Sequence, residues 1–284
     1  MKSSIKKIHF YLHNMFKTVI VKLWNEHDYF YHSPYGASFV LNFRKDVDRY
    51  LFFDSFENET LKLFQCMVGR EDVVVDVGAN IGIYSVIASK KNSGGGKVIA
   101  FEPSDWANSR LLLNIELNGC RNVTVFGNAV SEKRETLQFH MCDDDAYNSI
   151  GAKPMHEVKT VKNVEAIALD DFIPSLGISR VDLLKIDTEG ADYLVVKGFE
   201  KHLRKEDAPV IFCEYNRNII SGYEFQIHEL YTFLVSLGFT IYELNGQALK
   251  VFDPATSCSN EIICVKPLKE PVLRKAIYET TTSR

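Results

Sequence analysis

The feature that most constrains the fold of this chain is a regular alternation of short β-branched runs and longer amphipathic runs, beginning at Asp72. Such alternation is typical of βαβ units, in which helices connect parallel strands. The expected parallel strands cover residues 73–77, 97–101, 122–126, 181–186 and 209–214. Helical patterns start at Ile81, run through 111–117, and cover 193–203 and 226–237. The sequence therefore predicts a doubly wound α/β fold with about five parallel strands.

Two later apolar runs, 239–244 and 261–265, are separated by a loop too short for a crossover helix. We therefore expect them to form an antiparallel pair at the sheet edge, which makes the sheet mostly parallel and seven-stranded. Residues 137–165 interrupt the alternation and predict a hairpin-like insertion. The expected parts of the chain are an N-terminal helix and cap (1–70), a Rossmann-like domain (71–267) and a loose tail (268–284).

Charge and cysteine usage narrow the class of protein. The 284 residues carry a formal charge of −4, with both signs spread along the sequence. Because this leaves no basic stripe for a phosphate backbone, no nucleic-acid partner is expected. The six cysteines form no CxxC pair and no secretory signal precedes them, which favours a reduced, cytoplasmic location.

The first 24 residues place apolar side chains at helical spacing, with lysines among them. Lys17 and Lys22 interrupt an apolar run far shorter than the roughly 20 residues that a membrane span requires. Two alternatives remain: the helix packs on its own domain, which we favour, or it lies on a membrane surface.

The turn after the first expected strand predicts the position of a cofactor. The segment DVGANIG opens directly into a helix, where doubly wound folds bind cofactors. The dinucleotide fingerprint GxGxxG would need glycine in place of Asn80, so NAD and FAD are disfavoured. A sulfonium cofactor carries a positive charge and no phosphate, and Asp76 offers it a carboxylate, although this side chain could instead cap the helix at Ile81. The expected cofactor residues of this turn are Asp76, Gly78, Asn80 and Gly82.

Two further strand ends border the same expected site. Glu102 follows the second strand, 20 residues after Gly82, where a carboxylate can accept both hydrogen bonds of a ribose diol. Asn128 and Ala129 follow the third strand and would border an adenine, although such residues are also ordinary turn formers.

Taken together, the segments VVVDVGANIGIYS, FEPS, NAVS, LDDF, VDLLKIDTEGAD and CEYN resemble the FkbM family of methyltransferases. The resemblance covers roughly residues 35–245, and its most specific piece is KIDTEG at positions 185–190. It implies a Rossmann-like methyltransferase fold, S-adenosylmethionine as cofactor, and methylation of a hydroxyl on a sugar or small-molecule natural product. Substrate specificity is then expected in residues 1–70 and 137–165.

Methyl transfer from a sulfonium is an in-line displacement, and a base near the acceptor hydroxyl would speed it. Asp187 and Glu189, after the fourth strand, are the expected bases, with His228 ranked below Asp187. Glu214 ends the fifth strand, so Asp187 and Glu214 could together hold Mg²⁺, or act as a base and its orienting partner. Lys185 is expected to form an ion pair with Asp187.

Two competing functions remain to be weighed. Asn80 argues against an NAD-dependent oxidoreductase. A non-catalytic, membrane-associated binding module is disfavoured because Asp76, Gly78, Gly82 and Glu102 are all present. The run Asp143 to Asp145 is expected to be a solvated stretch of charge, with substrate or metal binding as the less favoured alternative.

Overall fold

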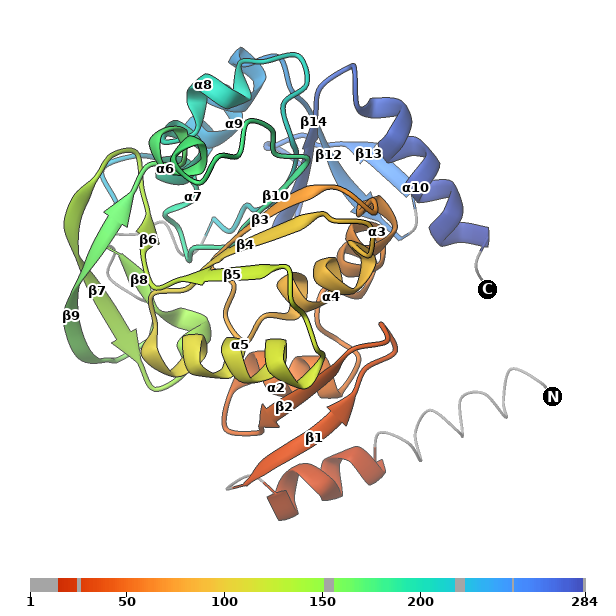
Figure 1. The fold of residues 1–284 in the computed structure, drawn as a ribbon, viewed down its shortest axis with the longest axis vertical. Coiled ribbons are helices and arrows are strands. Elements are labelled where there is room, and N and C mark those ends of the chain that lie inside the picture. Colours follow the sequence, from red (N-terminus) through yellow and green to blue (C-terminus); the bar gives the residue numbers. More distant parts are fainter. Residues whose placement is uncertain (1–14, 25–26, 151–155, 218–222, 247, 283–284) are drawn as a thin grey trace.

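The computed structural model describes residues 15–24, 27–150, 156–217, 223–246 and 248–282. Its centre is an eight-stranded sheet in the order β13-β12-β14-β11-β10-β3-β4-β5 (Figure 1). Five neighbouring strands of this sheet run parallel: β3 (Val73–Val77), β4 (Lys97–Phe101), β5 (Val123–Phe126), β10 (Leu183–Ile186) and β11 (Val210–Glu214). The predicted doubly wound α/β fold is confirmed.

The chain order reverses between β3 and β10. From β3 the chain adds β4 and then β5 on one side, whereas β10 and then β11 lie on the other side. The carboxyl ends of strands at such a reversal form the crevice where doubly wound folds bind ligands. Asp76 lies in β3, and Asp187 directly follows β10. The fold therefore places both residues at this crevice.

The far edge of the sheet contains one strand more than predicted. β14 (Glu261–Val265) runs antiparallel to both β11 and β12 (Thr240–Asn245), so the predicted antiparallel pair is confirmed. The count of seven strands is wrong, because β13 (Ala248–Val251) pairs with the outer side of β12. β13 is short and mostly exposed, with Val251 62% exposed, so it lacks the apolar pattern that marks a buried strand.

Helices cover both faces of the sheet (Figure 1). One apolar core lies between the sheet and helices α3 (Asn58–Met67), α4 (Ile83–Lys91) and α10 (Glu270–Thr282), with α5 (Asp105–Leu117) packed beside it. The other core lies beneath helices α6 (Leu169–Ser175), α7 (Asp192–Lys197), α8 (Glu200–Leu203) and α9 (Ile227–Ser236). The predicted helix over 193–203 is divided into α7 and α8.

The segment expected to be a loose tail is instead helical. Leu273 and Ala276 of α10 are buried in the same core as α3, so this helix is held against the domain. The spacing of Leu273, Ala276 and Ile277 is the helical signal that the sequence offered.

The N-terminal cap shares this core with the sheet. It contains the hairpin of β1 (Asp28–His32) and β2 (Ser38–Asn42), followed by α2 (Asp46–Phe52) and α3. Phe39, Leu41 and Phe52 are buried in the same core as α3 and α4, and alternate residues of β2 face inward, as expected of a strand with one buried face.

Residues 15–24 form the described part of the predicted N-terminal helix, and residues 1–14 lie outside the described residues. Lys17 turns inward and pairs with Asp54 at 2.7 Å, whereas Phe16, Val19 and Leu23 are exposed. One side of this helix therefore packs on the domain and the other does not. Among the described residues, no helix combines the length and apolar character needed to cross a bilayer. The cytoplasmic location stays a prediction.

The insertion between β5 and β10 forms a second, four-stranded sheet in the order β6-β9-β7-β8. Its strands are β6 (Ala129–Val130), β7 (Glu135–Cys142), β8 (Ser149–Ile150) and β9 (Val158–Ile167). Pairing of β7 with β9 is antiparallel, which confirms the hairpin-like prediction. The connection after β7 contains a short 3-10 helix, η1 (Asp145–Tyr147), which faces the cap.

Candidate active site

A cavity of about 310 Å³ lies at the crevice where the strand order reverses. Its floor is formed by the turns that follow β3, β4, β10 and β11. The cap contributes Tyr50 and Phe56 to its walls, and the insertion contributes Tyr147. The cavity is therefore lined by the two segments that we expected to determine substrate specificity, together with the strand ends of the α/β domain.

The turn after β3 is folded by contacts with its neighbours on both sides. The backbone N–H groups of Gly78 and Ala79 both donate to the carbonyl oxygen of Phe101, each at 3.0 Å. Gly78 has φ of +76°, which favours glycine, and a Cβ atom there would overlap the carbonyl oxygen of Asp187. Neighbouring backbone therefore occupies the space of a side chain at this position, which by itself requires glycine there.

Asn80 also has a left-handed backbone, with φ of +49°. Its side-chain Oδ1 accepts a hydrogen bond from the N–H of Ile81 at 2.8 Å, the local bond that makes this conformation tolerable for asparagine. Gly82 lies outside the cavity lining, and a Cβ atom on it would overlap the side chain of Leu111. The structure thus places Asn80 at the cavity and Gly82 against α5.

Asp76 is buried beneath the cavity wall and accepts a hydrogen bond from the hydroxyl of Ser85 at 2.6 Å. This partner lies on α4, so the carboxylate does not cap the helix at Ile81. Burial raises the pKa of Asp76 to about 6, although the Ser85 hydrogen bond lowers it. A carboxylate held this way gains from any positive charge brought into the cavity.

Glu102 is fixed by two backbone donors. Its Oε2 accepts from the N–H of Asn80 and its Oε1 from the N–H of Ser104, both at 2.8 Å. Each oxygen keeps a lone pair that can accept a further hydrogen bond, as a ribose diol would donate. Burial raises the pKa of Glu102 to about 7, although these two hydrogen bonds lower it.

Asn128 and Ala129 also line the cavity, beside the end of β5. The amide of Asn128 donates to the carbonyl of Glu165 at 3.2 Å, and Ala129 begins β6. Their position agrees with the predicted adenine border, which stays a prediction.

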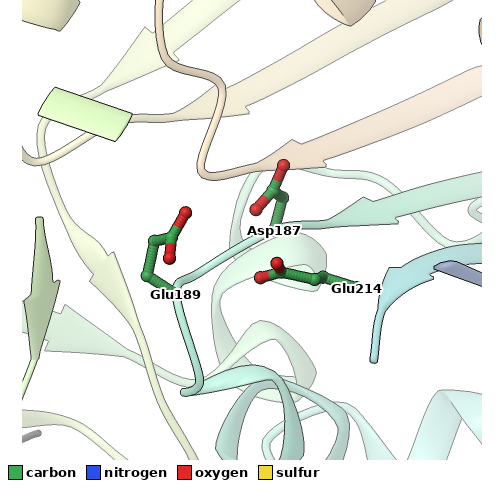
Figure 2. A group of neighbouring side chains, drawn as sticks. All are labelled: Asp187, Glu189 and Glu214. Carbon is green, nitrogen blue, oxygen red and sulfur yellow. The ribbon is translucent and has the colours of Figure 1, made fainter. Parts of the chain in front are cut away.

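Three carboxylates converge at the mouth of β10 and β11. Asp187, Glu189 and Glu214 each place one carboxylate oxygen within 4.8 Å of the others, and Figure 2 shows the three groups turned toward a shared space. Glu189 has φ of +52°, so the turn after β10 bends sharply enough to return its side chain to the cavity. The structure thus brings together three of the four predicted catalytic residues.

The fourth, His228, is not brought to the site. It lies in the first turn of α9, is exposed and is absent from the cavity lining. The structure therefore contradicts the expectation that it could reach the strand ends, because the first turn of this helix faces solvent.

A buried lysine lies behind the three carboxylates. The ammonium of Lys185 is 3.3 Å from Asp187, which confirms the predicted ion pair, and 3.9 Å from Glu57. Burial alone would lower the pKa of Lys185, but Asp187 and Glu57 raise it well above its ordinary value. Glu57 also accepts a hydrogen bond from the hydroxyl of Tyr84, and burial raises the pKa of Glu57 to about 7.

The three carboxylates carry more negative charge than Lys185 can balance. Burial and the charges of Asp187 and Asp192 raise the pKa of Glu189 well above its ordinary value. Burial and the charges of Asp187 and Glu189 likewise raise the pKa of Glu214 well above its ordinary value. The cluster is thus arranged to hold a proton or a cation.

The aspartates of the insertion do not form the solvated run that we expected. Lys45 of the cap contacts Asp145 at 2.6 Å, and the N–H of Asp46 donates to Asp144 at 2.6 Å. Asp145 also accepts from Ser104. Asp143 alone of the three is strongly exposed. The run therefore joins the insertion to the cap over the cavity.

Sequence reasoning missed several lining residues. Tyr84 and Tyr147 were not singled out, and Glu57 was assigned no role in the site. Glu57 has φ of +37°, a left-handed backbone that no local pattern signals, since it is set by the entry into α3. The charges around Lys185 could have suggested a further acid, because a buried lysine with several neighbours of opposite charge is a common arrangement.

Comparison with known proteins identifies the family. The model of the methyltransferase FkbM domain matches residues 76–241, more than half of the chain. The chain belongs to the FkbM methyltransferase family, as predicted, and its α/β sheet is the Rossmann-like methyltransferase fold.

Two curated relatives show how far this similarity extends. The methyltransferase sdnD of Sordaria araneosa is 30% identical over 157 residues, which cover 45% of this chain and 60% of the relative. The hexuronic acid methyltransferase AglP of Haloferax volcanii is 26% identical over 157 residues, which cover 55% of this chain and 61% of the relative. Each match thus spans about three fifths of the relative.

Solved structures with related folds are more distant in sequence. An O-methyltransferase from Bacillus cereus in complex with SAH has a TM-score of 0.43 at 14% identity, with 73% of this chain and 79% of that chain covered. TYW2 of M. jannaschii in complex with AdoMet has a TM-score of 0.40 at 18% identity, with 84% of this chain and 83% of that chain covered.

Proposed function

We propose that this protein is an S-adenosylmethionine-dependent methyltransferase that transfers a methyl group to a hydroxyl of a sugar or small-molecule natural product. One observation carries the proposal: a single cavity unites the glycine turn, the ribose-type acid Glu102 and three converging carboxylates. The glycine turn and Glu102 suit a nucleoside cofactor, and the three carboxylates suit proton removal from an acceptor. Membership of the FkbM family supports it.

In this proposal the cofactor lies over the turn after β3. Glu102 accepts hydrogen bonds from the ribose hydroxyls, and Asn128 and Ala129 border the adenine. Asp76 lies beneath the turn, where its carboxylate favours the positively charged sulfonium over a phosphate. A dinucleotide would instead bring its pyrophosphate to Asn80, next to the buried Glu102 carboxylate, which is why an NAD-dependent oxidoreductase is disfavoured.

The acceptor would enter between the cap and the insertion. Its oxygen would take the methyl group as the carbon–sulfur bond breaks, and its proton would pass to Asp187, with Glu189 and Glu214 beside it. A divalent ion such as Mg²⁺ at Asp187 and Glu214 would serve the same end, because a bound ion favours loss of the hydroxyl proton. The name of the hexuronic acid methyltransferase relative supports a sugar acceptor.

Two measurements test the proposal. The first compares binding of S-adenosylhomocysteine and NADH to the purified protein by calorimetry, with binding of the former alone expected. The second incubates the protein with a labelled methyl donor and panels of glycans and metabolite extracts, with base-stable label on a hydroxyl expected. Binding of NADH alone would overturn the proposal. A protein that sediments with liposomes and binds no S-adenosyl ligand would instead support the non-catalytic, membrane-associated module.

A further inference from the structure

We propose that the helix over residues 15–24 docks this protein on the surface of a membrane that contains anionic lipids. The docking surface is the exposed apolar side of this helix, here called the outer stripe, which consists of Met15, Phe16, Val19 and Leu23. The cavity described above is lined by other residues. The inference therefore adds an interaction surface and does not depend on the proposed methyl transfer.

The helix is apolar on two sides, and the domain covers one of them. Ile20 and Val21 pack against the core that the cap shares with the sheet. The side chains of the outer stripe are 49–66% exposed, and Figure 1 shows the helix, coloured red, on the outside of the cap beyond β1. Neighbouring apolar side chains left exposed in this way mark an interaction surface, because a helix that is apolar all round is normally covered all round.

The charge of this segment points to the kind of partner. Residues 1–24 contain five lysines and no aspartate or glutamate. Because the whole chain has a formal charge of −4, the rest of the chain carries −9. Positive charge is thus concentrated in the segment that contains the outer stripe, and Lys22 is exposed three positions after Val19. Apolar side chains beside lysines are the combination that binds an anionic membrane surface.

The domain holds the helix in place for this contact. Lys17 on its inner side pairs with Asp54 at 2.7 Å, and the hydroxyl of Tyr31 donates to the same carboxylate at 3.0 Å. Trp24 ends the described helix, is 43% exposed and makes an edge contact with Tyr29. An indole in such a position suits the headgroup level of a bilayer, since it is apolar with one polar N–H group.

Two other partners fit this surface less well. Two copies of the chain that met at the outer stripe would bring together two segments of like charge, five lysines in each, which repel one another. A nucleic acid would attract the lysines but would leave Phe16 and Leu23 in water. An anionic bilayer satisfies both the charge and the apolar side chains.

The test measures co-sedimentation of the full chain with vesicles of phosphatidylcholine, either alone or with about one third phosphatidylserine. Wild type should bind the anionic vesicles about tenfold more tightly, and the binding should weaken as salt is added. The double variant Phe16→Gln/Leu23→Gln should lower affinity for the anionic vesicles about tenfold. Lys22→Glu should reduce the preference for phosphatidylserine.

Matched controls change the same kinds of side chain elsewhere on the surface. Val272→Gln/Tyr278→Gln removes two exposed apolar side chains from α10, and Lys205→Glu reverses an exposed charge after α8. Both should leave vesicle binding unchanged. A second readout uses Trp106→Phe, which leaves Trp24 as the remaining tryptophan. Vesicles with brominated acyl chains should then quench the emission of Trp24.

The outcomes separate docking from the proposed function. Absent binding, or equal binding to the two kinds of vesicle, overturns the inference. Binding that persists in Phe16→Gln/Leu23→Gln, or that leaves Trp24 unquenched, places the contact elsewhere and also overturns it. So does a dimer in sedimentation velocity that this variant abolishes, because the outer stripe then contacts a second copy. Should the double variant fail to fold, quenching of Trp24 decides. Binding of S-adenosylhomocysteine, measured on the same proteins, tests the methyltransferase separately.

Discussion

A Cβ atom on Gly78 would overlap the carbonyl oxygen of Asp187, so the turn after β3 and the turn after β10 meet backbone to backbone. The N–H of Asp187 also donates to the carbonyl of Val77 at 3.0 Å, which fixes the two turns relative to each other. Gly78 belongs to the expected cofactor turn, and Asp187 carries the expected base. In the proposed mechanism, the contact would therefore set the distance between the methyl donor and the acceptor.

Gly78→Ala should destabilise the protein and also displace Asp187. The left-handed backbone alone costs an alanine about 1–2 kcal/mol, and the overlap with Asp187 adds to that cost. Gly36→Ala is a matched control, because Gly36 has a similar φ of +74° and open space at its Cβ position. Chemical denaturation of both variants should give a larger loss for Gly78→Ala, and equal losses would contradict the proposed contact.

The repeating α/β part could be predicted because its signals are local. Each central strand is a buried β-branched run, and each following helix repeats apolar side chains with helical spacing. β13 was not predicted because it buries too few side chains to show a strand pattern. α10 was not predicted because its segment follows a proline and was interpreted as a tail from its position in the sequence.

Glu102→Ala should weaken S-adenosylhomocysteine binding roughly 10- to 150-fold, since loss of a hydrogen bond to a charged acceptor costs about 1.5–3 kcal/mol. Asp105→Ala is the control, because Asp105 is exposed on α5 and pairs with Lys162 at the surface. Calorimetry on the two variants should show this difference. Similar affinities would remove Glu102 from the ribose site.

Binding of S-adenosylhomocysteine should strengthen as the pH rises from 6 to 8. The pKa of Glu102 is raised to about 7, and ribose hydroxyls donate to its ionised form. If only that form binds, affinity should rise about tenfold over this range, because the ionised fraction rises by that factor. Glu102→Gln should lose most of this dependence, and a wild-type affinity that is flat over this range would contradict the assignment.

Site residues at strand ends could be predicted, since turns that follow parallel strands converge at one edge of the sheet. The roles of Glu57 and Tyr84, and the contacts between the insertion and the cap, could not be predicted. Glu57 reaches Lys185 only because the cap folds back over the sheet, 128 positions earlier in the chain than its partner. The ion pair between Lys45 and Asp145 likewise joins segments 100 residues apart, and no local pattern specifies such a contact.

Lys185→Met should destabilise the protein by about 3–5 kcal/mol at pH 8, because removal of one partner leaves buried carboxylates without a counter-charge. The loss should be smaller near pH 5. The pKa of Glu57 is raised to about 7 in the folded state, so its stabilising effect is complete below about 4.5 and disappears as the pH rises through 7. Lys159→Met, at an exposed ion pair with Glu157, should leave stability nearly unchanged. Urea unfolding at both pH values checks this, and a loss independent of pH would contradict the charge argument.

Asp187→Asn should lower methyl transfer at least tenfold while S-adenosylhomocysteine affinity stays within a few-fold. Asparagine keeps the shape of the side chain but cannot accept the acceptor's proton, and such a loss is confined to the transition state. Asp143→Asn is the control, because Asp143 is exposed on the insertion. Single-turnover rates with an identified acceptor, measured beside calorimetric affinities, separate the two effects. If Asp187 acts as a cation ligand, wild-type activity should also fall in EDTA and return with Mg²⁺. Full activity of Asp187→Asn would exclude both roles and move the chemistry to Glu189 or Glu214, which share the same space.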